Sequence, residues 1–370
     1  MRSVRDAIAD AILADFAELL KEFNPAAHPR NPGGMGDASG QFVSTGGPGT
    51  SSGARGSSDY RRLVPRELIV EARQSATAHQ FPAGSVRNTS PKLAEEIAAK
   101  LHLRDQYNKA GRSTEMLYEH GAGGLPKGVW TRSRSQLHRQ LKKKWRRENA
   151  DIPREKVAVV FAGLPGSGKG YAQSDDLGLD LGFDKSQMAV IDPDKVKSDL
   201  IGSDPSDYAG LPGLQAAGLY HEESSTVADE ILTSVTDPYS PDYGKNVVYD
   251  YVMSSESSGG DKIERLQKAG YKVRVVLVDA EPEVALANAE DRYKETGRLI
   301  AFDAATRDAE TGTNAARDAF NAVRSAAATG TPIKRKKGPD IHLEPIEWTL
   351  VRGVRSGSGE VPEVVARSDA

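Results

Sequence analysis

The sequence contains no cysteine, so disulfide bonds, thiolate-ligated zinc and a cysteine nucleophile are all excluded. Its seven histidines are scattered without the spacing of metal ligands. No run of about 18 apolar residues occurs anywhere, so we expect no membrane span. The formal net charge of −3 argues neither for nor against nucleic acid as a partner. These features predict a cytoplasmic protein.

The first 150 residues and the last 18 differ in composition from the rest of the chain. Residues 1–23 repeat apolar side chains at helical spacing, with acidic residues that break any signal-peptide pattern, and predict an amphipathic helix. Residues 24–59 are rich in Gly, Pro, Ser and Asn, which predicts a disordered linker. Residues 60–150 predict a small helical accessory region, in which Leu93–Leu103 is the clearest helix. Residues 353–370 predict a flexible tail.

The helical region ends in a strongly basic segment, residues 130–147. Leu137, Leu141 and Trp145 give this segment an apolar stripe at i, i+4 and i+8. A basic helix of this kind can bind the phosphates of nucleic acid, an anionic membrane surface or an acidic partner. The alternative is a solvated helix that docks by its apolar stripe. The basic residues are Arg132, Arg134, Arg139, Lys142, Lys143, Lys144, Arg146 and Arg147.

Residues 151–352 alternate short apolar runs with helical or polar stretches. Such alternation predicts a three-layer α/β domain, in which a parallel sheet lies between two layers of helices. The predicted strands are Val157–Phe161, Met188–Ile191, Val247–Tyr249, Val273–Val278 and Trp348–Val351.

The first of these strands leads directly into a glycine-rich loop with the pattern and context of a phosphate-binding loop, which predicts that the three-layer α/β fold is of the P-loop NTPase type. Its glycines let backbone N–H groups point at a β-phosphate, and Lys169 can bridge β- and γ-phosphate oxygens, so we expect ATP here. The next residue usually supplies a hydroxyl to Mg²⁺, but here it is Gly170; water or another carboxylate can fill that place. The loop consists of Gly163, Leu164, Pro165, Gly166, Ser167, Gly168, Lys169 and Gly170.

Carboxylates follow the second and third predicted strands, at the sheet edge where open α/β sheets bind ligands. We predict that Asp194 takes the proton of an acceptor hydroxyl, with Asp192 as the rival candidate and as a substrate-binding residue. The alternative is that both only cap the helix that starts near Lys195. Asp250 ends the third strand and is predicted to hold Mg²⁺ through water, unless it is merely a turn residue.

Two further pairs of charged residues are candidates for the site. Glu222 and Glu223 open a predicted helix, where they can reach the acceptor or can simply be solvated acids at a helix N-terminus. Arg292 and Arg298 follow the fourth strand, where they can neutralise charge on a transferring phosphoryl group. The alternative for each arginine is pairing with a neighbouring acidic residue.

Six segments in this order resemble the zeta toxin family of P-loop kinases, over about residues 156–303. The resemblance implies ATP and Mg²⁺, an acceptor such as UDP-N-acetylglucosamine, and an antitoxin partner. It also implies that Lys169, Asp194, Arg292 and Arg298 are catalytic. A linker segment, HPRNPGGMGDASGQFVS, is similar to phage head-associated proteins, which suggests a phage structural protein as partner and a virion location. The six segments are GLPGSGKG, VIDPDKVK, HEESS, NVVYD, KAGYKVRVVLVD and DRYKETGR.

The leading hypothesis is therefore a kinase that phosphorylates a small acceptor. A polynucleotide 5′-kinase is the first alternative, since it shares the P-loop and a base aspartate, and the basic helix can hold a strand. A non-enzymatic nucleotide-binding module, tethered to a phage particle, nucleic acid or a partner, is the second. Gly170 keeps this last hypothesis open.

Overall fold

The computed structural model describes residues 91–120, 128–174, 179–204, 208–299, 314–355 and 358–368. The predicted amphipathic helix and the predicted linker lie outside the described residues. In the part of the chain that is described, no helix is long and apolar enough to cross a membrane.

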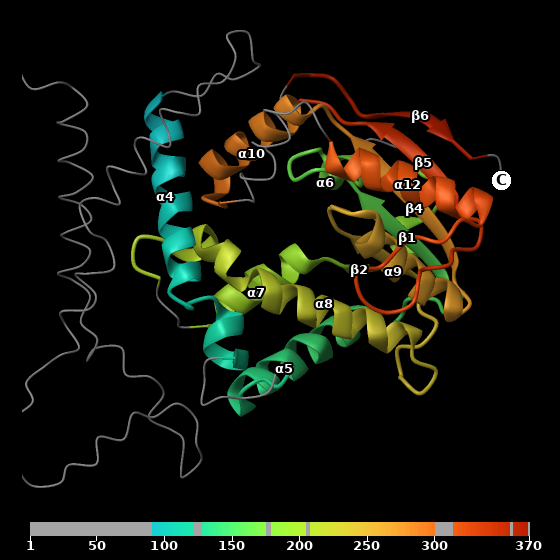
Figure 1. Cartoon of the computed structure of the whole chain (residues 1–370), viewed down its shortest axis with the longest axis horizontal. Coiled ribbons are helices and arrows are strands. Elements are labelled where there is room, and N and C mark those ends of the chain that lie inside the picture. Colours follow the sequence, from blue (N-terminus) through green and yellow to red (C-terminus); the bar gives the residue numbers. More distant parts are fainter. Residues whose placement is uncertain are drawn as a thin grey trace, which may run out of the picture. The chain divides into compact units, whose positions relative to one another are not determined.

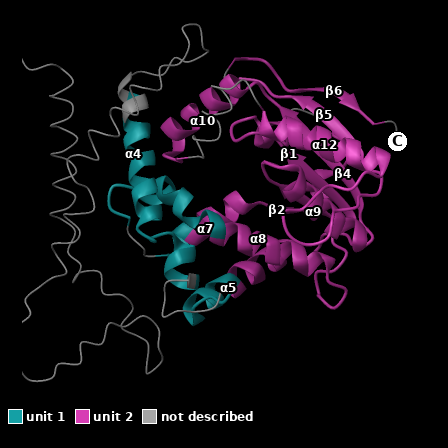
Figure 2. Ribbon diagram, viewed as in Figure 1, with its two compact units in different colours: residues 1–80, 90–138, 201–222 teal, residues 81–89, 139–200, 223–370 magenta. Residues whose placement is uncertain are grey.

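The described residues belong to two compact units whose ranges interleave along the sequence (Figure 2). Unit 1 contains Ser90–His138 and Ile201–Glu222, whereas unit 2 contains Arg139–Leu200 and Glu223–Ala370. Helices α5, α7 and α8 each cross from one range to the other.

Unit 1 consists of α4 (Pro91–Lys109), a π-helical turn (Met116–His120), a 3₁₀ helix (Gly213–Tyr220) and the ends of the three shared helices. Tyr107 donates a hydrogen bond from its hydroxyl to the carbonyl of Ala209 at 3.0 Å. The hydroxyl of Tyr208 donates to the carbonyl of Arg112 at 2.8 Å. These two bonds join segments that lie about a hundred residues apart in the sequence.

Unit 2 is built on a six-stranded sheet in the order β2-β3-β1-β4-β5-β6 (Figure 1). The first five strands are parallel, and β6 pairs antiparallel with β5. β6 lies within the segment for which the composition predicts a flexible tail. The strands are β1 (Val157–Ala162), β2 (Ala189–Ile191), β3 (Val247–Asp250), β4 (Lys272–Asp279), β5 (Glu347–Arg352) and β6 (Glu363–Arg367).

The central strands are continuous apolar runs because both faces of the sheet are buried. Helices α9 (Glu256–Lys268) and α12 (Ala315–Thr329) pack together and cover one face over β4 and β1 (Figure 1). On the other face, Val159 and Phe161 pack with Leu181 and Met188, which come from the connection between the glycine-rich loop and β2. The predicted three-layer α/β fold is thus confirmed.

Four further helices of this unit connect the strands. The helix after the glycine-rich loop is only one turn long, as its glycine- and aspartate-rich sequence suggests. Helix α10 ends at Gly297, whose positive φ of 68° suits glycine at a helix C-terminus. The bounds are α6 (Lys169–Ala172), α7 (Pro193–Ser203), α8 (His221–Thr236) and α10 (Pro282–Thr296), with a 3₁₀ turn at Lys185–Gln187.

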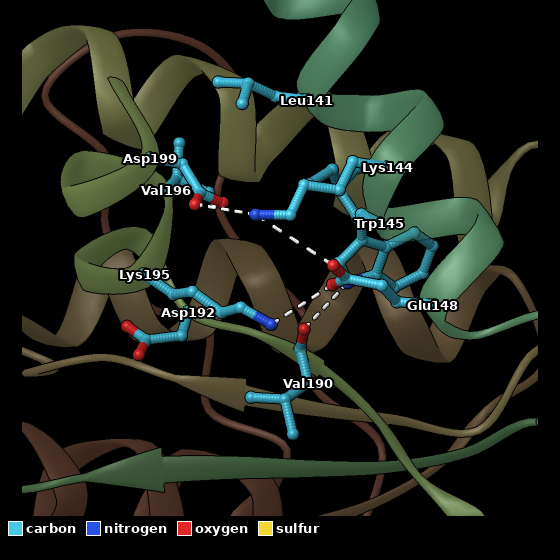
Figure 3. Close-up of a pocket in the computed structure, with 10 residues that line it drawn as sticks. Leu141, Lys144, Trp145, Glu148, Val190, Asp192, Lys195, Val196 and Asp199 are labelled. Carbon is cyan, nitrogen blue, oxygen red and sulfur yellow. Dashed lines mark hydrogen bonds and ion pairs between the residues drawn. The ribbon is translucent and has the colours of Figure 1, made fainter. Parts of the chain in front are cut away.

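The second half of α5 (Arg132–Glu148) lies in unit 2 and covers the edge strand β2. Leu141 and Trp145 of its apolar stripe are each only 8% exposed. The indole N–H of Trp145 donates to the carbonyl of Val190 on β2 at 2.7 Å (Figure 3). The pocket between α5, α7 and β2 has a volume of about 20 Å³, room for about one water molecule. Helix α5 therefore closes an edge that would otherwise offer unpaired backbone groups.

Several basic residues of this half of α5 pair with acidic residues of unit 2. Lys142 lies 2.6 Å from Glu230, and Lys144 lies 2.8 Å from Asp199. Arg146 pairs with the buried Asp242 at 2.8 Å. The docked-helix alternative is therefore what the structure shows for this half. Binding of nucleic acid through the basic segment stays a prediction, with Arg139, Lys143 and Arg147 exposed.

We expect Trp145→Phe to destabilise the protein by about 1 kcal/mol, because it removes the donor to the Val190 carbonyl while keeping an aromatic ring. The measurement is the free energy of unfolding in urea. Trp348→Phe is the control, because the ring contacts of Trp348 with Phe320 and Arg324 do not depend on an indole N–H. Equal losses for the two variants would contradict a role for the hydrogen bond.

Candidate active site

The glycine-rich loop, Gly163–Gly170, connects β1 to α6 at the carboxyl edge of the sheet. Gly166 has a φ of 83°, and a Cβ at this position would lie 2.0 Å from the carbonyl oxygen of Ala285 on α10. Only glycine fits both the conformation and the space. The loop is therefore packed tightly against the start of α10.

Asn288 and Arg355, which carry no sequence motif, support this loop through hydrogen bonds. Asn288 donates from its side-chain amide to the carbonyl oxygens of Gly166 at 2.9 Å and of Val354 at 3.0 Å. Arg355 donates to the Asn288 side-chain oxygen at 2.9 Å and pairs with Asp291 at 2.5 Å. No local motif marks these residues, since they come together only through contacts 66 and 122 residues apart.

Lys169 is the first residue of α6 and lies against the loop itself. Its ammonium group donates to the carbonyl oxygen of Gly163 at 2.9 Å and to that of Leu164 at 3.3 Å. These two bonds hold the ammonium group of Lys169 at the loop, where it could contact a nucleotide phosphate.

Asp192 directly follows β2, and its carboxylate accepts a hydrogen bond from the backbone N–H of Asp194 at 2.7 Å. Since α7 begins at Pro193, this bond is a helix cap, as the alternative interpretation of the sequence expected. Burial raises the pKa of Asp192 to about 6, and the nearby carboxylates of Asp250 and Asp194 add to the shift. Asp192 combines the capping role with the raised pKa that a general base requires near neutral pH.

Asp194 lies in the first turn of α7 and has both carboxylate oxygens engaged. Lys197 Nζ lies 3.1 Å from Oδ1, and Arg298 Nη2 lies 2.5 Å from Oδ2. Desolvation raises the pKa of Asp194, but the positive charges of Lys197 and Arg298 outweigh it and hold the pKa well below its usual range. Asp194 is therefore ionised and paired.

Asp250 ends β3, which lies between β2 and β1. Its Oδ2 accepts a hydrogen bond from the side-chain amide of Gln173 at 2.9 Å. The effect of its charge on Asp192 shows that the two carboxylates face the same region. The predicted convergence of these aspartates at one sheet edge is what the structure shows.

Arg292 belongs to the same electrostatic cluster from the side of α10. Desolvation and the positive charge of Arg298 lower its pKa, while Asp194, Asp192 and Asp250 act in the opposite direction. Unlike Arg298, it has no ion pair with any residue that the structure describes.

The two predicted acceptor-binding glutamates differ in exposure. Glu223 is fully buried in the first turn of α8, whereas Glu222 is exposed. Both have partners. They also fall in different compact units, Glu222 in unit 1 and Glu223 in unit 2 with the aspartates. Glu223, as a buried group, is thus poorly placed to touch a ligand directly unless α8 moves.

The residues at this edge fit a hydrated magnesium ion better than a fully protein-ligated metal. No group of three or more His, Cys, Asp or Glu side chains among the described residues is arranged to hold a metal. Asp250 and Asp192 supply carboxylate oxygens, and Mg²⁺ keeps several waters in such sites. Gly170 offers no hydroxyl, but a Cβ there would meet nothing within 4 Å.

A glycine-rich loop ending in lysine, followed by carboxylates and arginines at one edge of a parallel sheet, defines the class of P-loop kinases. The profile of the zeta toxin family matches residues 142–342, more than half of the chain. The chain belongs to the zeta toxin family, as the resemblance of its motifs predicts.

Comparison with solved structures gives distant matches. A crystal structure of AvrRxo1-ORF1:-ORF2 with ATP is 18% identical, with a TM-score of 0.45, covering 69% of this chain and 76% of that chain. A structure from the PezAT chromosomal toxin-antitoxin system of Streptococcus pneumoniae is 13% identical, with a TM-score of 0.41, covering 65% of this chain and 82% of that chain. Comparison with curated proteins gives no match.

The opposite pKa shifts of the two aspartates predict opposite pH dependences of stability. Asp192 has a raised pKa in the folded state, so its ionisation costs stability as the pH rises from about 4 to about 6. Relative to the native protein, Asp192→Asn should therefore gain stability over this range, by about 1–3 kcal/mol at pH 7. Urea unfolding between pH 4 and pH 8 measures the difference.

Asp194→Asn is the matched control, because the lowered pKa of Asp194 has the reverse effect. The ionised Asp194 stabilises the fold above the unfolded-state pKa, and this contribution is lost as the pH falls. Asp194→Asn should therefore be less stable than the native protein at pH 7, with a difference that shrinks in acid. Stability differences that do not change with pH for either variant would contradict the assignment.

Proposed function

We propose that this protein is an ATP-dependent phosphotransferase that moves the γ-phosphoryl group of ATP to a hydroxyl of a small acceptor. The observation that carries the proposal is the placement of Lys169, two aspartates and two arginines around one edge of the sheet, beside a phosphate-binding loop. Membership of the zeta toxin family supports the same reaction class.

In this proposal the loop backbone and Lys169 bind the β- and γ-phosphates of ATP. Arg292 and Arg298 neutralise charge on the transferring phosphoryl group. Asp194 or Asp192 takes the proton of the acceptor hydroxyl. Asp250 would hold Mg²⁺ through water, and that ion would neutralise phosphate charge.

The acceptor is proposed from the family resemblance to be a UDP-N-acetyl sugar such as UDP-N-acetylglucosamine. Glu222 and Glu223 are proposed to contribute to its binding, Glu223 after a movement of α8 that exposes its carboxylate. An antitoxin partner is proposed on the same ground, since the family match is to a toxin.

The test is transfer of label from γ-labelled ATP in the presence of Mg²⁺, with UDP-sugars, nucleosides and 5′-hydroxyl oligonucleotides as acceptors. We expect transfer to a UDP-sugar, and a loss of at least about 100-fold in Lys169→Ala, since the phosphates lose their cation. Lys195→Ala, which removes an exposed lysine of α7, should transfer normally.

Transfer to the oligonucleotides alone would replace the small acceptor by a polynucleotide 5′-end. ATP binding without transfer to any acceptor would contradict the kinase proposal and favour a nucleotide-binding module.

The open space at Gly170 allows a direct test of the missing hydroxyl. We expect Gly170→Ser to lower the Mg²⁺ concentration needed for half-maximal transfer, because serine restores the usual metal ligand. Gly170→Ala is the control, since it adds the same Cβ without a hydroxyl. The measurement is a Mg²⁺ titration at fixed ATP. An equal change of the half-maximal Mg²⁺ concentration in both variants would mean that the substitution acts through helix α6 and not through a metal ligand.

A further inference from the structure

The two arginines at the sheet edge are engaged differently. Arg298, with a side chain only 9% exposed, is paired to Oδ2 of Asp194 at 2.5 Å. Arg292 approaches the same aspartates without an ion pair among the described residues. The ion pair with Asp194 is thus specific to Arg298 and is not shared by Arg292.

The partner of Arg298 is also the residue for which the sequence predicts the base role. With Lys197 on Oδ1 and Arg298 on Oδ2, each oxygen of this carboxylate already meets a cation, and this weakens its ability to take the proton of an acceptor hydroxyl. While the ion pair is intact, Asp194 is therefore a poor general base and Arg298 is not available to a phosphate group.

The γ-phosphate of ATP competes for the same guanidinium. A phosphate group offers more negative charge and more acceptor oxygens than a carboxylate, and an arginine can bind it through two N–H groups. The Asp194 side chain is 47% exposed and that of Arg298 is 9% exposed, so the ion pair is half-buried and can be reached by a ligand from the Asp194 side.

We propose that the Asp194–Arg298 ion pair is a latch that the γ-phosphate of ATP opens. This inference rests on the proposed kinase function. Arg298 leaves Asp194 for the γ-phosphate, and Oδ2 of Asp194 becomes free to accept a proton. Lys197 stays on Oδ1 and keeps the carboxylate in place. ADP lacks the γ-phosphate and leaves the latch closed.

The proton and electron balance of the step is complete with ATP and the acceptor alone. The acceptor oxygen forms a bond to the γ-phosphorus, and the bond from that phosphorus to the bridging oxygen of ADP breaks. The hydroxyl proton moves to Oδ2 of Asp194. The base is thus available only when the phosphoryl group that it serves is present.

The latch has a consequence that needs no acceptor. Breaking the ion pair costs part of the binding free energy of ATP but none of that of ADP. Asp194→Asn should therefore bind ATP about threefold more tightly than the native protein, with the affinity for ADP unchanged. Calorimetric titration with ATP and with ADP, both with Mg²⁺ and without acceptor, measures the two affinities.

Two further variants separate the latch from simple loss of a negative charge. Asp192→Asn removes a carboxylate from the same edge, but Asp192 has no ion pair with an arginine in the part of the chain that the structure describes. The ratio of the ATP affinity to the ADP affinity should change less in Asp192→Asn than in Asp194→Asn. In an Arg298→Met background, Asp194→Asn should add no more preference than Asp192→Asn does, because the ion pair is already gone.

An equal effect of the two aspartate variants, or an effect of Asp194→Asn that persists without Arg298, would overturn the latch. Thermal unfolding of each variant checks that the site is folded, and Arg298→Lys, which keeps the charge, serves if Arg298→Met unfolds. Failure of the kinase proposal is seen separately, as absence of transfer in the label assay. A native protein that binds neither nucleotide would overturn both proposals.

Discussion

The gathering of three carboxylates, Asp192, Asp194 and Asp250, at one partly buried sheet edge is the constraint around which the candidate site is organised. Parallel strands end at the same edge of a sheet, so residues that directly follow β2 and β3 necessarily approach one another. The surroundings of the three carboxylates differ. Asp194 pairs with two cations, and Asp250 accepts an amide N–H from Gln173. Burial raises the pKa of Asp192 to about 6, and the charges of Asp250 and Asp194 add to the shift. One edge thus holds carboxylates of unequal basicity, which is what proton transfer at neutral pH requires.

The phosphate-binding loop depends on a second constraint, the close approach of backbone to backbone. Gly166 leaves no room for a Cβ beside the Ala285 carbonyl, and a Cβ at Gly353 would lie 2.5 Å from the carbonyl of Ser167. The loop therefore packs closely between α10 and the residue that follows β5. Asn288 adds hydrogen bonds to both sides of this contact. A loop held this firmly has little conformational entropy left to lose when a phosphate binds.

Local patterns were enough to predict the strands and the loop. The parallel strands are short apolar runs bounded by polar residues, and the glycines and Lys169 form a contiguous motif, so no long-range information is needed. The convergence of Asp192 and Asp250 also followed, because it depends only on the strands being parallel. Strand β6 was not predicted. Its exposed strand pattern, EVVAR, is short, and its pairing with β5 decides its structure.

The partners within the site could not be predicted from sequence. Arg298 had acidic residues closer in the sequence than Asp194, and nothing local chooses among them. Asn288 and Arg355 act through contacts that exist only after α10 and the end of β5 come together. The roles of individual site residues stay predictions, since geometry shows which groups meet and not which step each one serves.

The basic pattern of residues 130–147 is compatible both with binding to nucleic acid and with docking of the helix on acidic residues of the same chain. Eight cations on one helix suggest an anionic macromolecule as partner. In the structure, however, Lys142, Lys144 and Arg146 meet acids of unit 2, and Trp145 satisfies an edge carbonyl of β2. The family match begins at residue 142, within this same helix, and unit 2 begins at Arg139. Three of the six cations in this half of α5 therefore attach the helix to α7, α8 and the segment before β3. Any nucleic-acid binding would rest on the exposed cations Arg139, Lys143 and Arg147, which follow one another at one-turn spacing on the side of the helix opposite the apolar stripe.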